Sequence, residues 1–175
     1  HKKVISIVSP CYNEENNVAN CYETVKKLFS EELPNYEFEH IFSDNASDDR
    51  TVSILKKIAK KDRRVKIIVN SRNYGPFRSM FNAMKRAYGD AVIPQLAVDL
   101  QDPPSVIPKF VEKWESGYRV VSGARAKREE GLIMRFIRSI FYNMVSRMSE
   151  FKIPANVGEF QLIDRAVVDA LSEFD

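Results

Sequence analysis

Short β-branched apolar runs alternate with segments of helical periodicity through the first hundred residues. The apolar runs are Val4–Ser9, Tyr36–Ser43, Val65–Asn70 and Ala91–Val98. Helices are predicted from Asn13 to about Phe29, after Thr51 with a buried face of Val52, Leu55, Ile58 and Ala59, and from Gly75 to about Tyr88. Strands that alternate with helices across short connections favour parallel pairing, with helices on both faces of the sheet. The sequence therefore predicts an α/β fold with a Rossmann-like, mostly parallel sheet.

The pattern continues past residue 100 and then changes. A helix is predicted near Ser105–Ser116 and a strand at Tyr118–Ser122, followed by a long helix over Leu132–Phe151 that mixes apolar residues with arginines. A chain of 175 residues, 44% of them hydrophobic, holds one sizeable core, so we expect a single domain over residues 1–175. No apolar run approaches the roughly 20 residues needed to cross a bilayer. Two cysteines provide no disulfide framework, which favours a reducing compartment such as the cytosol.

Charge is spread unevenly along the chain. The net charge of +3 is too small to indicate nucleic acid as a partner. The stretch from Arg119 to Lys152, however, holds eight basic residues against three acidic ones. Such a segment suits phosphate groups or an anionic membrane surface, and a solvated helix face is the alternative interpretation.

Polar, acidic segments follow three of the predicted strands. They are Pro10–Glu15, Asp44–Thr51 and Asp99–Asp102. In an open α/β sheet, ligands bind beyond the carboxyl ends of the strands, where these segments meet. Carboxylates gathered there indicate a metal, a ribose or a base, although capping of a helix explains Asp44–Thr51 equally well when it is taken alone. Asp99, Gln101 and Asp102 offer hard oxygen ligands for Mg²⁺ or Mn²⁺.

Four segments, in this order and at these separations, carry a family resemblance. They are Ser9–Glu15, Asp44–Thr51, Arg72–Gly75 and Asp99–Pro104. Together they resemble the inverting family-two glycosyltransferases of the GT-A fold, and among these the polyprenyl-phosphate branch typified by dolichyl-phosphate mannose synthase and bacterial undecaprenyl-phosphate glucosyltransferases. The resemblance implies a nucleotide pocket formed by Pro10, Tyr12, Glu14, Asp44, Asn73 and Gly75. It implies a divalent ion held by Asp99 and Gln101.

The resemblance extends into the second half of the chain. Arg125 of Gly123-Ala124-Arg125, together with Arg135 and Ser139 of an Arg-x-x-x-Ser pattern, would receive a lipid phosphate, because residues four apart share one face of a helix. Glu159 would stand near the acceptor. The chain departs from the family at three places: Ala97 replaces an acidic residue, Asn45-Ala46 stands where Asp-Gly is common, and Glu159 replaces aspartate.

The implied reaction transfers a sugar from a nucleotide-sugar, UDP-linked more readily than GDP-linked, to a polyprenyl phosphate with inversion. A phosphate acceptor is already anionic at neutral pH, whereas a saccharide hydroxyl would need Asp102 or Glu159 as a base. A polysaccharide-forming transferase and a degenerate sugar-nucleotide binder, suggested by Ala97, stay open as alternatives. A dehydrogenase is disfavoured because no Gly-x-Gly-x-x-Gly follows the first strand. We expect action at the cytoplasmic face of a membrane, with membrane helices beyond Asp175 as in this branch.

Overall fold

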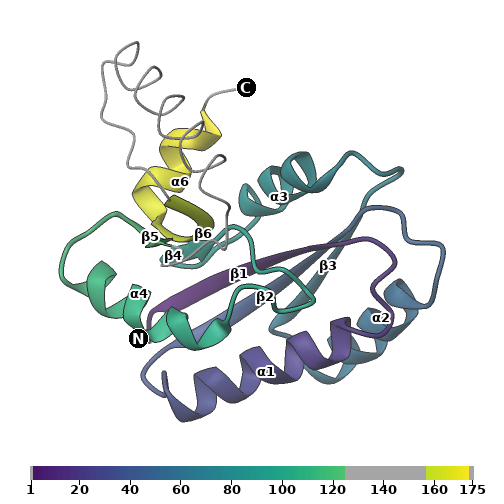
Figure 1. The fold of residues 1–175 in the computed structure, drawn as a ribbon, viewed down its shortest axis with the longest axis horizontal. Helices are drawn as coiled ribbons and strands as arrows, with labels where there is room; N and C mark the ends of the chain where they lie inside the picture. The colour runs from purple at the N-terminus through teal and green to yellow at the C-terminus, as the bar shows by residue number, and fades with distance from the viewer. Residues whose placement is uncertain (1, 125–156, 174–175) are drawn as a thin grey trace, which may run out of the picture. The chain divides into compact units, whose positions relative to one another are not determined.

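The computed structural model describes residues 2–124 and 157–173 of the chain (Figure 1). Contacts divide the chain into two units, one formed by residues 1–121 with 160–175 and the other by residues 122–159. The elements of the first unit surround the predicted site. Of the second unit, the structure describes only residues 122–124 and 157–159, which belong to strands that continue into the first.

Six strands form one sheet in the order β3-β2-β1-β4-β6-β5. Their bounds are Val4–Cys11 (β1), Glu37–Asp44 (β2), Val65–Val69 (β3), Ala91–Ile93 (β4), Val120–Ala124 (β5) and Val157–Asp164 (β6). The first four pair in parallel, and β6 lies antiparallel to β4. β1 and β2 are paired along all eight residues, so Cys11 and Asp44 end their strands side by side. The predicted mostly parallel α/β sheet is confirmed.

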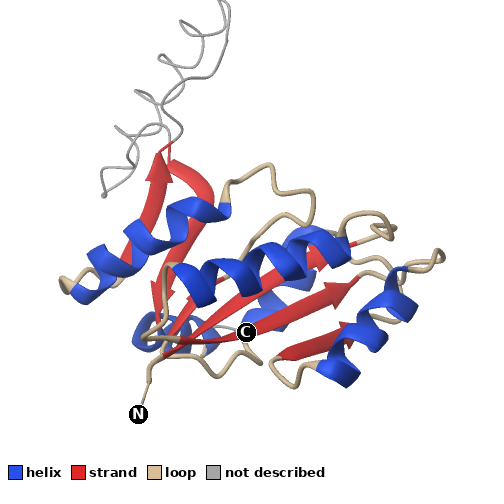
Figure 2. Cartoon of the chain, turned by 90° about the horizontal axis from the view of Figure 1, so that it is seen from below, coloured by secondary structure: helices blue, strands red, loops and turns tan. Residues whose placement is uncertain are grey.

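Helices cover both faces of the sheet (Figures 1 and 2). On one face, α1 (Val18–Glu31), α2 (Thr51–Lys61) and α4 (Ile107–Glu115, preceded by a 3-10 turn over Pro104–Val106) pack on the larger apolar core. On the other, α3 (Pro76–Met84) and α6 (Arg165–Ser172) pack on a smaller core. Within the described residues, no helix is long and apolar enough to cross a membrane.

Three predicted boundaries were wrong, and β6 was not predicted as a strand. The helix expected from Asn13 begins at Val18, because residues 12–17 form bends and turns. The strand expected over Ala91–Val98 ends at Ile93, because Pro94 has no N–H for the ladder, although Leu96 still donates to the Val8 carbonyl at 2.8 Å. The helix expected to reach Tyr88 ends at Met84, where the backbone changes to tighter turns. The long helix predicted over Leu132–Phe151 lies outside the described residues.

A buried carboxylate joins the parallel strands to the turn before β4. Glu39 is fully buried, and its Oε2 accepts from Ser6 Oγ at 2.5 Å and from the Tyr88 amide at 3.1 Å. Lys66 Nζ lies 2.5 Å from its other oxygen, so the charge is paired. Ser6 Oγ also accepts from the Gly89 amide, where a Cβ would come within 2.7 Å of Ser6 N. The turn can therefore close only around glycine.

A second buried polar group lies on the opposite face of β2. His40 is fully buried, its Nε2 is 3.0 Å from Ser9 Oγ, and its Nδ1 has no hydrogen-bond partner among the described residues. The ring stacks on Phe42 with the ring centres 4.0 Å apart. Desolvation by burial lowers the pKa of His40 from its ordinary 6.5 to about 3. His40 is therefore neutral in the folded protein.

This neutral histidine makes the fold sensitive to acid. Because the unfolded chain binds a proton near pH 6.5 and the folded chain only near pH 3, the stabilisation is complete above pH 6.5 and is lost as pH falls between these values. In urea unfolding, the free-energy difference between wild type and His40→Gln should shrink by about 2 kcal/mol from pH 7 to pH 5. A difference that stays constant with pH would show that the fold does not lower the pKa of His40.

Candidate functional site

The loops after β1, β2 and β4 meet at the carboxyl edge of the sheet, because these strands run parallel. The loop after β1 begins beyond Cys11, and the loop after β2 begins at its register partner Asp44. The third loop contains Asp99. These are the three segments that the sequence singled out.

A ladder of hydrogen bonds clamps the first two loops together. The consecutive amides of Asn13, Glu14 and Glu15 donate to the second loop. Their acceptors are Ser47 Oγ at 2.9 Å, Thr51 Oγ1 at 2.8 Å and Asp49 Oδ2 at 3.1 Å. Binding or helix capping was predicted for the second loop, whereas this clamping role was not, because the partners are more than thirty residues apart.

Bonds also run back from the second loop to the first. The Asp48 amide donates to Asn13 Oδ1, and the Arg50 amide and Nε both donate to Glu15 Oε2, each at 3.0 Å. The hydrogen bonds from Arg50 lower the pKa of Glu15, which therefore stays ionised. The amides of Asn13, Glu14 and Glu15, which precede α1, thus have hydrogen-bond acceptors within the protein. They do not form the anion-binding site that a helix N-terminus often provides.

Asp44 shapes the second loop from beneath. Its carboxylate is fully buried. It accepts from Ser47 Oγ at 2.5 Å and from the Ser47 amide at 3.0 Å. The following Asn45 amide donates to the Cys11 carbonyl at 2.9 Å, which ties the turn back to β1. In this structure Asp44 is enclosed by its own loop, so its contact with a base or ribose stays a prediction.

Each of the three loops contains one non-glycine residue in the left-handed backbone region. They are Asn13, Ala46 and Leu100, with φ of 55°, 63° and 58°. Asparagine tolerates this conformation, but alanine and leucine adopt it at a cost of roughly 1–2 kcal/mol each. Such strain concentrates where surrounding structure holds a functional loop in one shape. Nothing in the residue types of Ala46 or Leu100 predicted it.

The third loop presents Asp99 to solvent. Gln101 Nε2 donates to Asp99 Oδ2 at 2.6 Å, and the Leu100 amide closes a turn on the Ala97 carbonyl at 3.0 Å. Asp102 is half-buried and hydrogen-bonded or paired within the protein. Among residues 2–124 and 157–173, no three His, Cys, Asp or Glu side chains are grouped as a metal site. Asp99 therefore offers a single exposed carboxylate rather than a closed cage.

Two buried thiols show that the acidic loops converge. Desolvation by burial, together with the negative charges of Asp99 and Glu14, raises the pKa of Cys21 to about 12. Burial also raises the pKa of Cys11, with added contributions from Asp44 and Glu14. Glu14 therefore contributes to the electrostatic environment of both thiols, Asp99 to that of Cys21 and Asp44 to that of Cys11. The loops that carry these carboxylates follow parallel strands and begin at the same edge of the sheet.

The segment after β3 joins the second loop through amide side chains. Asn70 Nδ2 donates to Asn45 Oδ1 at 2.9 Å, and Asn45 Nδ2 donates to the Gly75 carbonyl at 3.3 Å. The Gly75 amide in turn donates to Asn73 Oδ1 at 2.8 Å, and Gly75 has a φ of 83°. Asn73 and Gly75 were predicted from the sequence. Asn70, whose side chain connects the two loops, was not.

The remaining predicted residues divide into described and undescribed ones. Pro10 is half-buried at the end of β1, and Tyr12 beyond it is 47% exposed. Arg125, Arg135 and Ser139 lie outside the described residues, and so does the side chain of Glu159. The predicted acceptor side of the site therefore stays a prediction.

The strained turn at Ala46 gives a direct test of the loop geometry. Replacing Ala46 with glycine removes the clash of a Cβ at positive φ, so Ala46→Gly should raise the free energy of unfolding by about 1 kcal/mol. The same change at Ala59, inside α2, should lower it by about 1 kcal/mol. Both are measured by urea unfolding. Destabilisation by both changes would contradict a left-handed Ala46.

Comparison with known proteins finds relatives that match most of the chain. The model of glycosyl transferase family 2 matches residues 6–172. A prophage bactoprenol glucosyl transferase homolog of Escherichia coli (strain K12) is 40% identical over 94% of this chain and 53% of its own length. The uncharacterized glycosyltransferase YkcC of Bacillus subtilis (strain 168) is 38% identical over 95% of the chain and 51% of its own length. The chain spans about half the length of these relatives.

Solved structures share the fold at low identity. The mannosyltransferase PcManGT of Pyrobaculum calidifontis, in complex with GDP-Man and Mn²⁺, superposes with a TM-score of 0.65 at 18% identity, over 98% of this chain and 47% of its own. Glucosyl-3-phosphoglycerate synthase of Mycobacterium tuberculosis, in complex with Mn²⁺, UDP and phosphoglyceric acid, gives 0.62 at 18% identity, over 94% and 57%. The fold is GT-A, as predicted. The chain belongs to glycosyl transferase family 2.

Proposed function

We propose that this domain transfers a sugar from a nucleotide-sugar to a polyprenyl phosphate with inversion at the anomeric carbon. The observation that carries the proposal is the convergence of Glu14, Asp44 and Asp99, from three loops, at one edge of a GT-A sheet. The polyprenyl acceptor is supported by relatives named bactoprenol glucosyl transferases. A UDP-linked donor is favoured over a GDP-linked one by the breadth of the family.

The donor nucleotide is assigned to the clamped loops. Glu14 and Gly75 are hydrogen-bonded to the second loop, and Asn73 accepts from Gly75. Tyr12 offers an exposed ring for a base. The amides of Asn13, Glu14 and Glu15 already donate to the second loop. The negative charge of the diphosphate therefore needs another partner. The exposed Asp99 is the group placed to hold a cation there.

A divalent ion fits this arrangement if it arrives with the diphosphate. Mg²⁺ and Mn²⁺ take oxygen ligands, and Mg²⁺ is commonly bound by one or two carboxylates plus substrate phosphates. Asp99 supplies one carboxylate and Gln101 one amide oxygen, whereas Ala97 supplies nothing. When bound, the ion neutralises negative charge on the departing nucleoside diphosphate. Related folds have been solved with Mn²⁺ and nucleotide, which supports this assignment.

The acceptor determines whether a base is required. A phosphate monoester with a second pKa near 6 is anionic at neutral pH and can attack without losing a proton to the protein. A sugar hydroxyl would need Asp102 or Glu159 to remove its proton. Arg125, Arg135 and Ser139 are the proposed ligands of the lipid phosphate. Such an acceptor places the domain at a membrane, at the cytoplasmic face in this proposal.

Asp99 provides the test of the donor site. In an assay of nucleotide release from a UDP-sugar, with detergent-dispersed polyprenyl phosphate and Mn²⁺, Asp99→Asn should lower kcat/KM by about 100-fold or more, because stabilisation of the leaving diphosphate is lost. The control is Asp169→Asn, the same change at an exposed position of α6, which should stay within about twofold of wild type.

The same assay separates the rival functions. Equal effects of the two variants would remove Asp99 from the site. Nucleotide binding without turnover on any acceptor would indicate a degenerate binder. Transfer to a saccharide hydroxyl, lost on Asp102→Asn, would replace the polyprenyl phosphate with a sugar acceptor.

A further inference from the structure

One stretch of the chain is far more cationic than the whole. Residues 56–89 hold eleven lysines and arginines against one acidic residue, Asp62, so this fifth of the sequence carries +10 while the entire chain carries only +3. The stretch forms the end of α2, the edge strand β3 and helix α3. Six of the eleven cations belong to α2 and the turn after it, and the other five belong to β3, α3 and the segments that join and follow them: Lys66, Arg72, Arg78, Lys85 and Arg86.

A groove runs between β3 and α3 along this edge. It has a volume of about 440 Å³, with Ile68 and Val69 from the strand and Arg78, Asn82 and Arg86 among its lining residues. These last three are spaced four residues apart and so follow one side of α3 and the turn after it. Arg86 donates to Asn82 Oδ1, whereas the exposed Arg78 has no ion pair among the described residues. The groove thus combines an apolar strand edge with available guanidinium groups.

Large apolar side chains are exposed beside these cations. Val69 is 53% exposed, Tyr74 39%, Phe77 59% and Tyr88 57%. Phe77 lies in the first turn of α3, next to Arg78. Exposed aromatic rings interleaved with lysine and arginine are typical of surfaces that enter the headgroup region of a bilayer.

The arrangement of the rings favours lipid over nucleic acid. Stacking of nucleobases needs an open ring face. The Arg72 guanidinium already lies 4.7 Å from the centre of the Tyr74 ring, and Lys66 Nζ lies 4.3 Å from that of Tyr88. These two rings are therefore partly covered, whereas their edges and the cations remain at the surface.

We propose that the β3–α3 edge is the surface on which this domain docks to anionic phospholipid headgroups of a bilayer. The choice of a lipid partner rests on the proposed function, whose acceptor is a lipid phosphate. Arg78 and Arg86 attract the headgroups, and Phe77 inserts among them. The edge also adjoins the donor site, because Asn70 lines the groove and bonds to Asn45 of the second loop.

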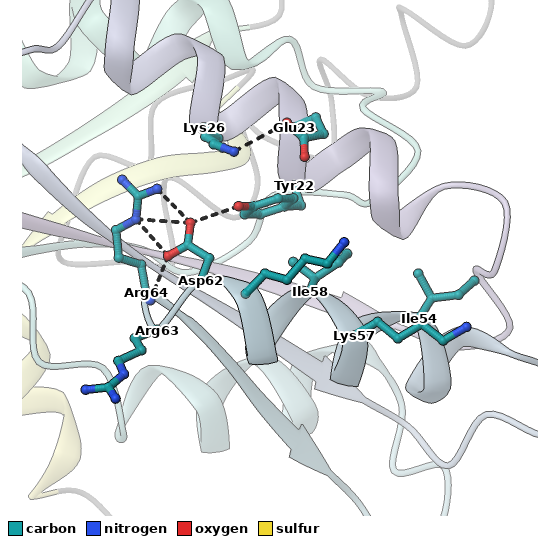
Figure 3. Close-up of a pocket in the computed structure, with 10 residues that line it drawn as sticks. Tyr22, Glu23, Lys26, Ile54, Lys57, Ile58, Asp62, Arg63 and Arg64 are labelled. Atoms are coloured by element: carbon teal, nitrogen blue, oxygen red, sulfur yellow. Dashed lines mark hydrogen bonds and ion pairs between the residues drawn. The ribbon is translucent and has the colours of Figure 1, made fainter.

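A second basic groove, between α1 and α2, serves as the contrast (Figure 3). It includes Lys57, Lys61 and Arg63 and has a similar volume of about 470 Å³. Part of its charge is neutralised, since Arg64 and the Tyr22 hydroxyl both bond to Asp62. Its one aromatic ring, Tyr22, is buried, and it belongs to the opposite face of the sheet from α3. This groove is basic, as the β3–α3 edge is, but none of the described residues that line it is an exposed aromatic residue.

Vesicle binding tests the proposal with matched variants. The chain is mixed with vesicles of phosphatidylcholine and phosphatidylglycerol, or of phosphatidylcholine alone, and the bound fraction is measured by sedimentation. Arg78→Glu with Arg86→Glu should weaken binding to the anionic vesicles by more than about 25-fold, at about fivefold for each lost cation. Lys57→Glu with Lys61→Glu, an identical charge change in the other groove, should weaken it by less than about fivefold.

Neutral variants test the aromatic contribution. Phe77→Ser should weaken vesicle binding about tenfold, because an inserted ring is lost without a change in charge. Tyr118→Ser removes a ring that is 60% exposed elsewhere and should leave binding unchanged. Circular dichroism confirms that each variant remains folded.

Several results would overturn the proposal. They are no preference for anionic vesicles, equal loss from the two charge-reversal pairs, displacement of the chain from vesicles by inorganic phosphate alone, and tighter binding to single-stranded RNA than to vesicles. Turnover with detergent-dispersed acceptor is measured in the same variants. If the wild-type chain turns over the dispersed acceptor but shows no preference for anionic vesicles, the docking surface is wrong and the proposed function stands.

Discussion

The hydrogen-bonded clamp between the loops after β1 and β2 is the constraint on which the site depends. Three successive amides of the first loop end on Ser47, Thr51 and Asp49 of the second, and side chains of the first loop receive amides of the second in return. Buried or partly buried amides need partners, so neither loop can keep this shape without the other. Parallel pairing of β1 and β2 along their whole length places the two loops where these bonds form.

Because of the clamp, the loops at this edge of the sheet have different roles. The amides of Asn13, Glu14 and Glu15, which precede α1, already have partners within the protein and are not free to bind a phosphate. Charge on a diphosphate must then be met elsewhere, which leaves the exposed Asp99 and a cation as the natural partners. The enclosed Asp44 and the strained Ala46 keep the second loop in one shape, and Asn45 extends the same network to the segment before α3. The fixed shape of the first two loops and the exposure of Asp99 fit the donor site that we propose.

Local patterns in the sequence predicted most of the fold. Alternating strands and helices predicted the parallel sheet, whose topology starts the loops that carry Glu14, Asp44 and Asp99 at one edge. Pro94 ended a strand that hydrophobicity alone extended to Val98, because a missing N–H outweighs apolar character. The β6 strand escaped prediction, since its antiparallel partner β4 lies more than sixty residues earlier. The prediction that Arg125, Arg135 and Ser139 bind the acceptor phosphate rests on family resemblance.

Details that depend on distant partners were not predictable from one sequence. The role of Ser47 and Thr51 as acceptors requires knowing which amides lie opposite them, and the role of Asn70 requires the position of Asn45. The cationic composition of residues 56–89 can be counted in the sequence. The placement of its Lys66, Arg72, Arg78, Lys85 and Arg86 at a sheet edge follows only from the strand order, with β3 outermost.

Backbone amide hydrogen exchange with and without UDP and Mn²⁺ tests the central claim most directly. If the three acidic loops form one nucleotide site, amides within residues 12–17, 44–51 and 99–102 should all exchange more slowly when the ligands are present. Slower exchange in only one of these loops, or only in the groove between α1 and α2, would contradict the account.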